Sequence, residues 1–133
     1  MMKNATSGKY ISYQLLLYLQ NTVKVEVGRL GKFTLPAGSY LYTGSARNNM
    51  EARLTRHLRK EKKLYWHIDY LTGRTDVTIL DVKKYTEEEC LVNLKTNGEI
   101  LIPGFGASDC RMKCGSHLKY LEARRIARIK VHY

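Results

Sequence analysis

The stretch from Gly38 to His57 limits most strongly what this chain can fold into. Its first part, GSYLYTGS, is rich in tyrosine, which favours a strand that ends at the glycine–serine turn. Beyond the turn, apolar residues recur at every fourth position, which predicts a short helix over residues 50–60 with one face packed on a sheet. Arg53 and His57 lie beside this face, one helical turn apart. A phenol, a guanidinium and an imidazole brought together in this way suit the handling of a phosphodiester.

The other elements follow from local patterns. The alternation in TVKVEV, residues 22–27, predicts a half-buried strand. Further strands are expected at residues 10–19, 32–35, 39–43 and 77–82, with helices at 64–71 and 86–95 and a returning strand or arm from His117. This order indicates an α+β domain with a small mixed or antiparallel sheet, and not a run of regular βαβ units.

Length and composition indicate one folded domain. The chain has 133 residues, of which 44% are hydrophobic, so we expect a single domain over residues 1–133 with a basic C-terminal arm at about 123–133. The longest apolar runs are far too short to cross a bilayer. The first residues show no apolar signal region, and three cysteines do not form a disulfide framework. These features predict a cytoplasmic protein.

The charge of the chain points to a polyanionic partner. Lysine and arginine total 23 against 12 acidic residues, which gives a formal net charge of +11. For a chain of this size the positive field is strong and favours nucleic acid, with an anionic membrane surface as the weaker option.

Two tripeptides identify a similar family. The chain resembles the GIY-YIG nuclease superfamily at GKY (residues 8–10) and YTG (residues 42–44), followed by Arg53 and His57. The resemblance implies a compact domain with a small central sheet flanked by helices. It also implies metal-dependent cleavage of nucleic-acid phosphodiesters, with DNA as the expected substrate. Such an enzyme can be structure-specific, as repair members of the superfamily are.

The chain departs from the pattern of this superfamily in three places. Arg53 lies one residue further from the YTG tripeptide than in typical members. The interval between Tyr10 and Tyr42 is longer than in typical members, which predicts an inserted hairpin at about residues 23–35. Ser45 stands where several active members carry a lysine. The alternative expectation is therefore a nucleic-acid-binding module of the same fold without catalysis.

The resemblance assigns catalytic roles to residues from distant parts of the chain. Tyr42, assisted by Tyr10 and His57, is the expected general base or the group that positions the attacking water. A free phenol has a pKa of about 10, so this role needs positive charge nearby. Arg53 is expected to hold the phosphate oxygens, because a guanidinium bridges two oxygens and stays protonated.

Glu89 is the expected ligand of a divalent metal, Mg²⁺ or Mn²⁺. The resemblance implies a glutamate on the last core helix, and these ions take oxygen ligands, often from only one or two carboxylates. A competing explanation is a capping box in which Thr86 and Glu89 satisfy the start of the helix. Glu88 is the second candidate for the metal.

Basic residues surround the Arg53 helix and are expected to contact phosphates. With Ser45, the predicted nucleic-acid-binding residues are Arg47, Arg56, Arg59, Lys60, Lys62 and Lys63.

Other chemistry-bearing residues have more ordinary explanations. Cys110, Cys114 and His117, joined by His67 or Cys90, resemble a zinc ligand set, but the spacing is loose and we do not expect zinc. His67 and Asp69 form either a catalytic pair or a structural tie, with Asp69 expected to be structural. Ser108 and Asp109, in a loop expected to pack on the active-site face, are candidates for substrate contact.

Overall fold

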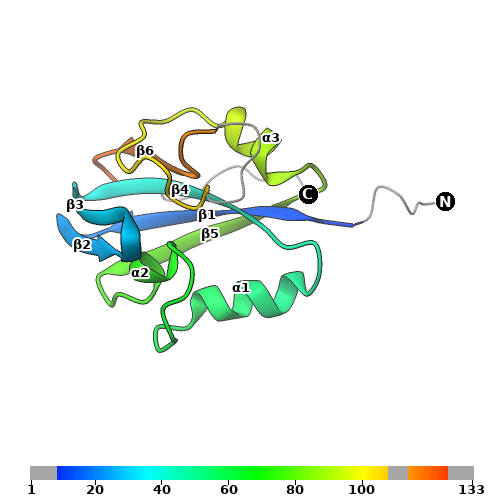
Figure 1. Cartoon of the computed structure of the whole chain (residues 1–133), viewed down its shortest axis with the longest axis horizontal. Coiled ribbons are helices and arrows are strands. Elements are labelled where there is room, and N and C mark those ends of the chain that lie inside the picture. Colours follow the sequence, from blue (N-terminus) through cyan, green and yellow to red (C-terminus); the bar gives the residue numbers. More distant parts are fainter. Residues whose placement is uncertain (1–8, 108–113, 126–133) are drawn as a thin grey trace.

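A four-stranded antiparallel sheet in the order β5-β1-β4-β6 forms the centre of the computed structural model, which describes residues 9–107 and 114–125 (Figure 1). Its strands are β1 (Ser12–Leu19), β4 (Gly38–Ser45), β5 (Val77–Tyr85) and β6 (Leu118–Glu122). A separate hairpin consists of β2 (Val23–Val27) and β3 (Gly31–Leu35), joined by a short 3₁₀ turn, η2 (Gly28–Leu30). The helices are α1 (Met50–Leu58), α2 (Asp69–Thr72) and α3 (Glu89–Leu94). The expected α+β class and the inserted hairpin are confirmed.

Strand β1 is buried on both faces because it lies between two neighbours and two layers. Residues of one face, such as Leu15 and Leu17, contribute to the main core. On the other face, Gln14 donates hydrogen bonds from Nε2 to the hydroxyls of Thr43 (3.1 Å) and Thr96 (2.7 Å), just beyond α3. A strand covered on both sides needs apolar residues at consecutive positions, which explains why its sequence shows no alternation.

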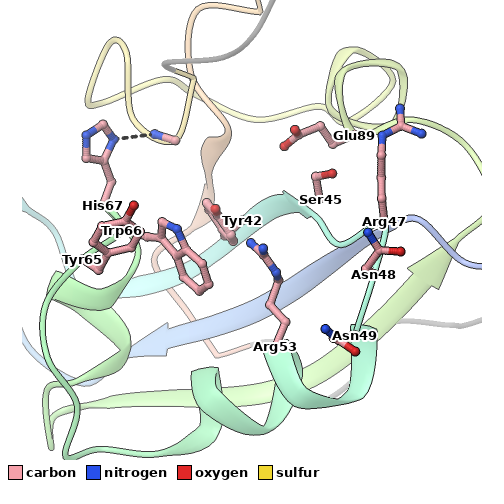
Figure 2. A pocket seen from close by; sticks show the side chains of 11 residues that line it. Tyr42, Ser45, Arg47, Asn48, Asn49, Arg53, Tyr65, Trp66, His67 and Glu89 are labelled. Carbon is pink, nitrogen blue, oxygen red and sulfur yellow. Dashed lines mark hydrogen bonds between the residues drawn. The ribbon is translucent and has the colours of Figure 1, made fainter.

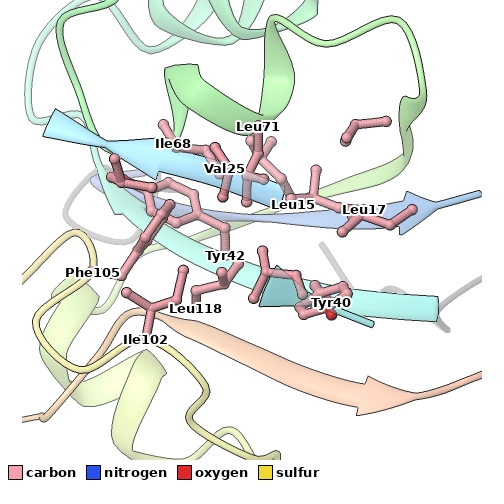
Figure 3. Close-up of a cluster of buried hydrophobic side chains, with 14 of the residues drawn as sticks. Leu15, Leu17, Val25, Tyr40, Tyr42, Ile68, Leu71, Ile102, Phe105 and Leu118 are labelled. Atoms are coloured by element: carbon pink, nitrogen blue, oxygen red, sulfur yellow. The ribbon is translucent and has the colours of Figure 1, made fainter. Parts of the chain in front are cut away.

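The main core joins the sheet to α1, α2 and the hairpin. Figure 3 shows Tyr40 and Tyr42 of β4 beside Leu15 and Leu17 of β1, with hairpin and loop residues closing over them. The fully buried members outside the sheet are Val23, Val27, Leu35, Ile68, Leu71, Ile102 and Phe105. The core therefore fixes β4 in position, and with it the residues at the end of that strand.

Helix α2 is much shorter than the expected helix at 64–71. The buried carboxylate of Asp69 accepts hydrogen bonds from the backbone N–H groups of Tyr65 (2.9 Å) and Trp66 (2.8 Å). These bonds hold residues 65–66 in a turn ahead of the helix. The prediction was wrong at the start of the helix because Asp69, itself held by Arg56, binds residues 65 and 66 through a contact that no local sequence pattern contains.

Helix α3 begins at Glu89 and not at Thr86. Strand β5 extends to Tyr85, beyond the expected end at residue 82, because its last residues pair with the start of β1. Glu88, at the N-cap position, has extended backbone angles and no side-chain capping bond. The capping box of Thr86 and Glu89 is therefore absent, and the competing explanation for Glu89 is wrong.

Among the described residues, no helix is long and apolar enough to cross a membrane. The strand expected after His117 is present as β6. Most of the expected basic arm lies outside the described residues, as do Gly8, Ser108, Asp109 and Cys110.

Candidate functional site

A pocket of about 700 Å³ opens where β4 ends, between the start of α1 and the start of α3. Its wall comes from four separate parts of the chain: the segment from the end of β4 into α1, residues 65–67, the start of α3, and the loop at Gly106. Figure 2 shows these side chains around one space. The lining residues are Tyr42, Ser45, Arg47, Asn48, Asn49, Arg53, Tyr65, Trp66, His67, Glu89 and Gly106.

Tyr42, Arg53 and Glu89 meet in this pocket, although the chain separates them widely. In Figure 2, Arg53 extends from α1 toward Tyr42, and Glu89 faces them from α3. Both charged groups act on the phenol: burial has the largest effect and raises the pKa of Tyr42, Glu89 raises it further, and Arg53 lowers it. The phenol, the guanidinium and the carboxylate thus share one site.

The turn from β4 into α1 places Arg53. Asn49 adopts left-handed backbone angles, with φ of 58°, which asparagine tolerates better than most residues. Its carbonyl oxygen accepts the backbone N–H of Arg53 at 3.0 Å, so Asn49 occupies the N-cap position. Its side chain makes no capping bond and lines the pocket instead.

Tyr13, and not Tyr10, lies beside Tyr42. Within the described residues, the pocket wall does not include Tyr10, whose ring lies near the ammonium of Lys84. The ring centroid of Tyr13 is 6.4 Å from that of Tyr42, and its hydroxyl is hydrogen-bonded to Nε2 of His57 at 2.6 Å. The expected place of Tyr10 in the site is therefore corrected to Tyr13.

Gly44 makes room for Tyr13 on the neighbouring strand. A Cβ atom at position 44 would lie 2.5 Å from the hydroxyl oxygen of Tyr13 and 2.6 Å from the ring carbon that carries it. Any larger residue would displace the ring, so the glycine of the YTG tripeptide serves the packing of the site.

Tyr42 is a neutral hydroxyl and not an ionised base. Burial raises its pKa well above the usual value of 10.0, and the nearby Tyr13 and Glu89 raise it further. Arg53 acts in the opposite direction but does not outweigh them. Of the two roles expected for Tyr42, general base or orienting group, only the second agrees with this electrostatic environment.

His57 lies behind the site and is uncharged near neutral pH. Burial lowers its pKa from 6.5 to about 4, and the positive charge of Lys62 adds to this effect. Its ring is fully buried, packs against Trp66 and does not line the pocket. His57 was expected to assist Tyr42 together with Tyr10; in the structure it is hydrogen-bonded to the hydroxyl of Tyr13, whose ring lies beside Tyr42.

Trp66 separates two arginines of α1 that have different partners. The guanidinium carbons of Arg53 and Arg56 each lie 4.3 Å from the centre of a Trp66 ring. Arg56 forms a bidentate ion pair with the buried carboxylate of Asp69, at 2.7 and 2.8 Å. Arg56 therefore holds the turn at 65–66 to the helix, and its expected role in phosphate binding is corrected.

Two of the predicted phosphate-binding lysines cap backbone carbonyls. Lys60 donates to the carbonyl oxygens of Thr72 (3.1 Å), Arg74 (2.7 Å) and Val77 (2.5 Å). Lys62 donates to the carbonyl of His57 (2.9 Å) and the hydroxyl of Thr72 (2.6 Å). The ammonium groups of both lysines therefore bind acceptors within the fold, and neither lysine is among the residues that line the pocket.

The remaining predicted contacts differ in position. Ser45 and Arg47 line the pocket, and Arg47 forms an exposed ion pair with Glu88 at 2.6 Å. Arg59 and Lys63 are exposed but lie outside its wall. Glu88, the second candidate for the metal, is thus paired with Arg47 and does not line the pocket.

Glu89 fits a hard divalent cation. Its side chain is 28% exposed, and one oxygen lies 3.2 Å from Nδ1 of His117. One carboxylate at the wall of an open, polar pocket leaves room for water and substrate oxygens, the arrangement that Mg²⁺ accepts.

Sequence reasoning missed Tyr13, Trp66 and His117 as parts of this site. The odd-numbered residues of β1, Tyr13 among them, belong to the main core, but a strand that is apolar throughout does not reveal its orientation. His67 lines the pocket and accepts the backbone N–H of Gly106 at 2.8 Å through Nδ1, so it anchors the loop. Asp69 is structural, as expected.

Comparison with known proteins gives one result. A family model described as a domain of unknown function, DUF123, matches residues 12–132. Searches of curated proteins and of solved structures found no match. Because the family match spans nearly the whole chain, including every strand of the central sheet, the chain belongs to the DUF123 family.

Proposed function

We propose that this pocket binds a nucleic-acid phosphodiester and that the protein is a metal-dependent endonuclease, with DNA as its substrate. The observation that carries the proposal is the meeting of Tyr42, Arg53 and Glu89 in one open pocket. The net charge of +11 supports a polyanionic substrate. The resemblance of the YTG tripeptide and the Arg53 helix to the GIY-YIG superfamily supports the reaction type.

Arg53 and Arg47 would hold the phosphate. Arg53 stacks on Trp66, which restricts its guanidinium and directs it into the pocket. A guanidinium held in this way binds the non-bridging oxygens and stabilises the charge that develops on them during attack. Arg47 and Ser45 stand at the other side of the opening and would position the adjacent backbone.

Tyr42 would orient the attacking water through its neutral hydroxyl. Since its pKa is raised, it acts as a hydrogen-bonding group, and its position depends on Tyr13 and Phe105, which pack around its ring. Glu89 would hold Mg²⁺ or Mn²⁺, which supplies charge neutralisation and lowers the pKa of bound water. We also propose a cytoplasmic location, on the small number of cysteines.

A second candidate is a binding module without catalysis. The wall of the pocket carries Tyr65, which is 77% exposed, beside Trp66. Exposed aromatic rings next to arginines form a platform on which unpaired bases stack. Ser45, in place of a lysine common among active members of the superfamily, favours the same alternative.

A cleavage screen tests the proposal. End-labelled linear, nicked, flapped and branched DNA would be incubated with the protein and Mg²⁺ or Mn²⁺, and products resolved on denaturing gels. We expect cleavage that Arg53→Ala reduces by about 100-fold or more and that Glu89→Gln abolishes. Arg29→Ala removes the same charge from an exposed position outside the pocket wall and serves as the matched control.

The outcomes separate the two candidates. Salt-sensitive binding that depends on Arg53, without cleavage of any substrate, would establish the binding module and reject the endonuclease. Cleavage that survives both Arg53→Ala and Glu89→Gln would come from another site or a contaminant. Loss of cleavage in Arg29→Ala to the same degree would show that only total charge matters.

A further inference from the structure

Behind the pocket, two thiols and an imidazole come together from separate parts of the chain. Ligand atoms of Cys90, Cys114 and His117 all lie within 4.8 Å of one another. Cys90 is the second residue of α3, while Cys114 and His117 precede β6. Cys114 and His117 are buried, and Cys90 is partly buried. We infer that these three residues form a binding site for a zinc ion, distinct from the expected Mg²⁺ or Mn²⁺ site at Glu89.

The chemistry of the donors selects the metal. Thiolate and imidazole are the ligands of structural zinc, whereas Mg²⁺ and Mn²⁺ take oxygen ligands. Around a tetrahedral zinc ion, bond lengths near 2.3 Å to sulfur and 2.0 Å to nitrogen place two ligand atoms roughly 3.5 to 3.8 Å apart. Atoms within 4.8 Å of one another reach that geometry by small side-chain movements. Both thiols lose their protons on binding.

Two acceptors surround Nδ1 of His117. Its Nδ1 lies 3.2 Å from the carbonyl oxygen of Thr43 and 3.2 Å from Oε2 of Glu89. Both of these atoms are acceptors, so Nδ1 carries the proton and Nε2 carries the lone pair. A carboxylate or carbonyl that receives the other N–H of a histidine is the usual support for a zinc-binding imidazole.

A zinc ion at this position would stabilise the packing of α3. Helix α3 has only six residues, too few to be stable alone, and it carries Glu89 next to Cys90. A metal bound by Cys90, Cys114 and His117 would fix this helix to the chain that enters β6. It would also orient Glu89 through His117. The three residues leave a fourth position, which water or another donor fills.

The sequence named these three residues within a larger candidate set but did not favour zinc, because the local spacing of the cysteines and His117 is loose. Of the expected partners, the structure brings Cys90 to the cluster, while His67 anchors the loop at Gly106. Cys110 lies outside the described residues.

Metal analysis of the whole chain tests the inference. Protein expressed with added zinc and passed through a weak chelator should retain about one zinc ion per chain, measured by mass spectrometry of the metal. Replacement by Co²⁺ should give a sulfur-to-cobalt charge-transfer band and the visible bands of a tetrahedral ion. A strong chelator should lower the melting temperature, and added zinc should restore it. Protein without stoichiometric metal, or a cobalt spectrum without the sulfur band, would overturn the inference.

Variants assign the ligands. Cys90→Ser and Cys114→Ser should each lower the affinity for zinc by about 100-fold or more, since even the loss of a supporting group lowers metal affinity by 10- to 100-fold. The control is Leu91→Ser, at a position of the same helix that is 40% exposed, which should keep full zinc content. If Cys114→Ser does not fold, Cys90→Ser and the chelator experiment on the native chain still show whether the cluster binds zinc. Native zinc affinity in Cys90→Ser would overturn the inference.

Glu89→Gln separates this inference from the proposed nuclease. It should abolish cleavage while the protein retains one zinc ion, with an affinity about 10-fold weaker because His117 loses its charged acceptor. Zinc content is measured without any nucleic acid, so an inactive protein that binds zinc would reject the nuclease alone. An active protein without zinc would reject this inference alone.

Discussion

The two ends of helix α1 carry similar cations that perform different tasks. At its start, Arg53 faces the pocket, and Arg47 in the preceding turn also lines it. At its end and just beyond, Arg56 and Lys62 are bound to a buried carboxylate and to backbone carbonyls. A basic segment is therefore not a uniform binding surface. Basic side chains beside the end of a helix hydrogen-bond to nearby carboxylate and carbonyl oxygens of the fold. Only the basic side chains that face the pocket remain available to a ligand.

The sharpest test of this difference compares Arg53→Ala with Arg56→Ala. Loss of Arg56 leaves the buried Asp69 carboxylate without its counter-charge, so the free energy of unfolding should fall by about 3 kcal/mol. Loss of Arg53 should change stability by less than about 1 kcal/mol but reduce cleavage about 100-fold. Urea denaturation and the cleavage assay measure the two effects. If Arg53→Ala lost more stability than Arg56→Ala, the assignment of Arg53 to the pocket and of Arg56 to the fold would be wrong.

The acid sensitivity of the end of the helix should come from His57. Its pKa is about 4 in the folded chain and 6.5 when exposed, so the unfolded state binds the proton first as the pH falls. The contribution of neutral His57 to the free energy of unfolding is fully present above pH 6.5. It declines as the pH drops toward 4, by about 3 kcal/mol in all. Urea midpoints measured across this range check the slope. His57→Gln should remove most of it, and an unchanged slope in that variant would assign the acid sensitivity to other groups.

A smaller effect should distinguish Lys62 from Arg47. Lys62→Met leaves the carbonyl of His57 and the hydroxyl of Thr72 without their donor, and should destabilise the fold by about 1 to 2 kcal/mol. Arg47→Met breaks only an exposed ion pair, worth less than about 0.5 kcal/mol. It should weaken DNA binding and lower the slope of binding against salt by about one ion. Fluorescence anisotropy at several salt concentrations measures the affinity for DNA and its salt dependence. A lower salt slope in Lys62→Met and an unchanged slope in Arg47→Met would show that Lys62, and not Arg47, contacts DNA.

A modest effect should come from Trp66→Phe, because Trp66 contacts both Arg53 and Arg56. A phenyl ring keeps the packing between Arg53 and Arg56 but attracts a cation more weakly than indole does, so stability should change by about 0.5 to 1 kcal/mol. Thermal denaturation measures this change. A loss as large as that of Arg56→Ala would mean that Trp66, and not the ion pair with Asp69, holds the turn.

Much of the fold was readable from the sequence, because strands and amphipathic helices leave local patterns. The strand at 22–27 followed from the valine alternation, the hairpin at about 23–35 from the long interval between Tyr10 and Tyr42, and α1 from its apolar spacing. The helix at 64–71 was not predicted correctly, since the side chain of Asp69 and its partner Arg56 act through contacts that no local pattern contains. For the candidate site, Tyr42, Arg53 and Glu89 were named from the resemblance, whereas Tyr13 required the pairing of β1 with β4.

The sequence alone determined the class of the fold, its strong positive charge and the types of side chain available for phosphate chemistry, because these depend on composition and on short periodic patterns. Only the tertiary structure decided which cations face the pocket and which side of β1 lies beside Tyr42. It also decided that Cys90 meets Cys114 and His117. These choices depend on distances between residues remote in the chain, and on burial, which sets both the pKa of Tyr42 and the partners that each charged group must find.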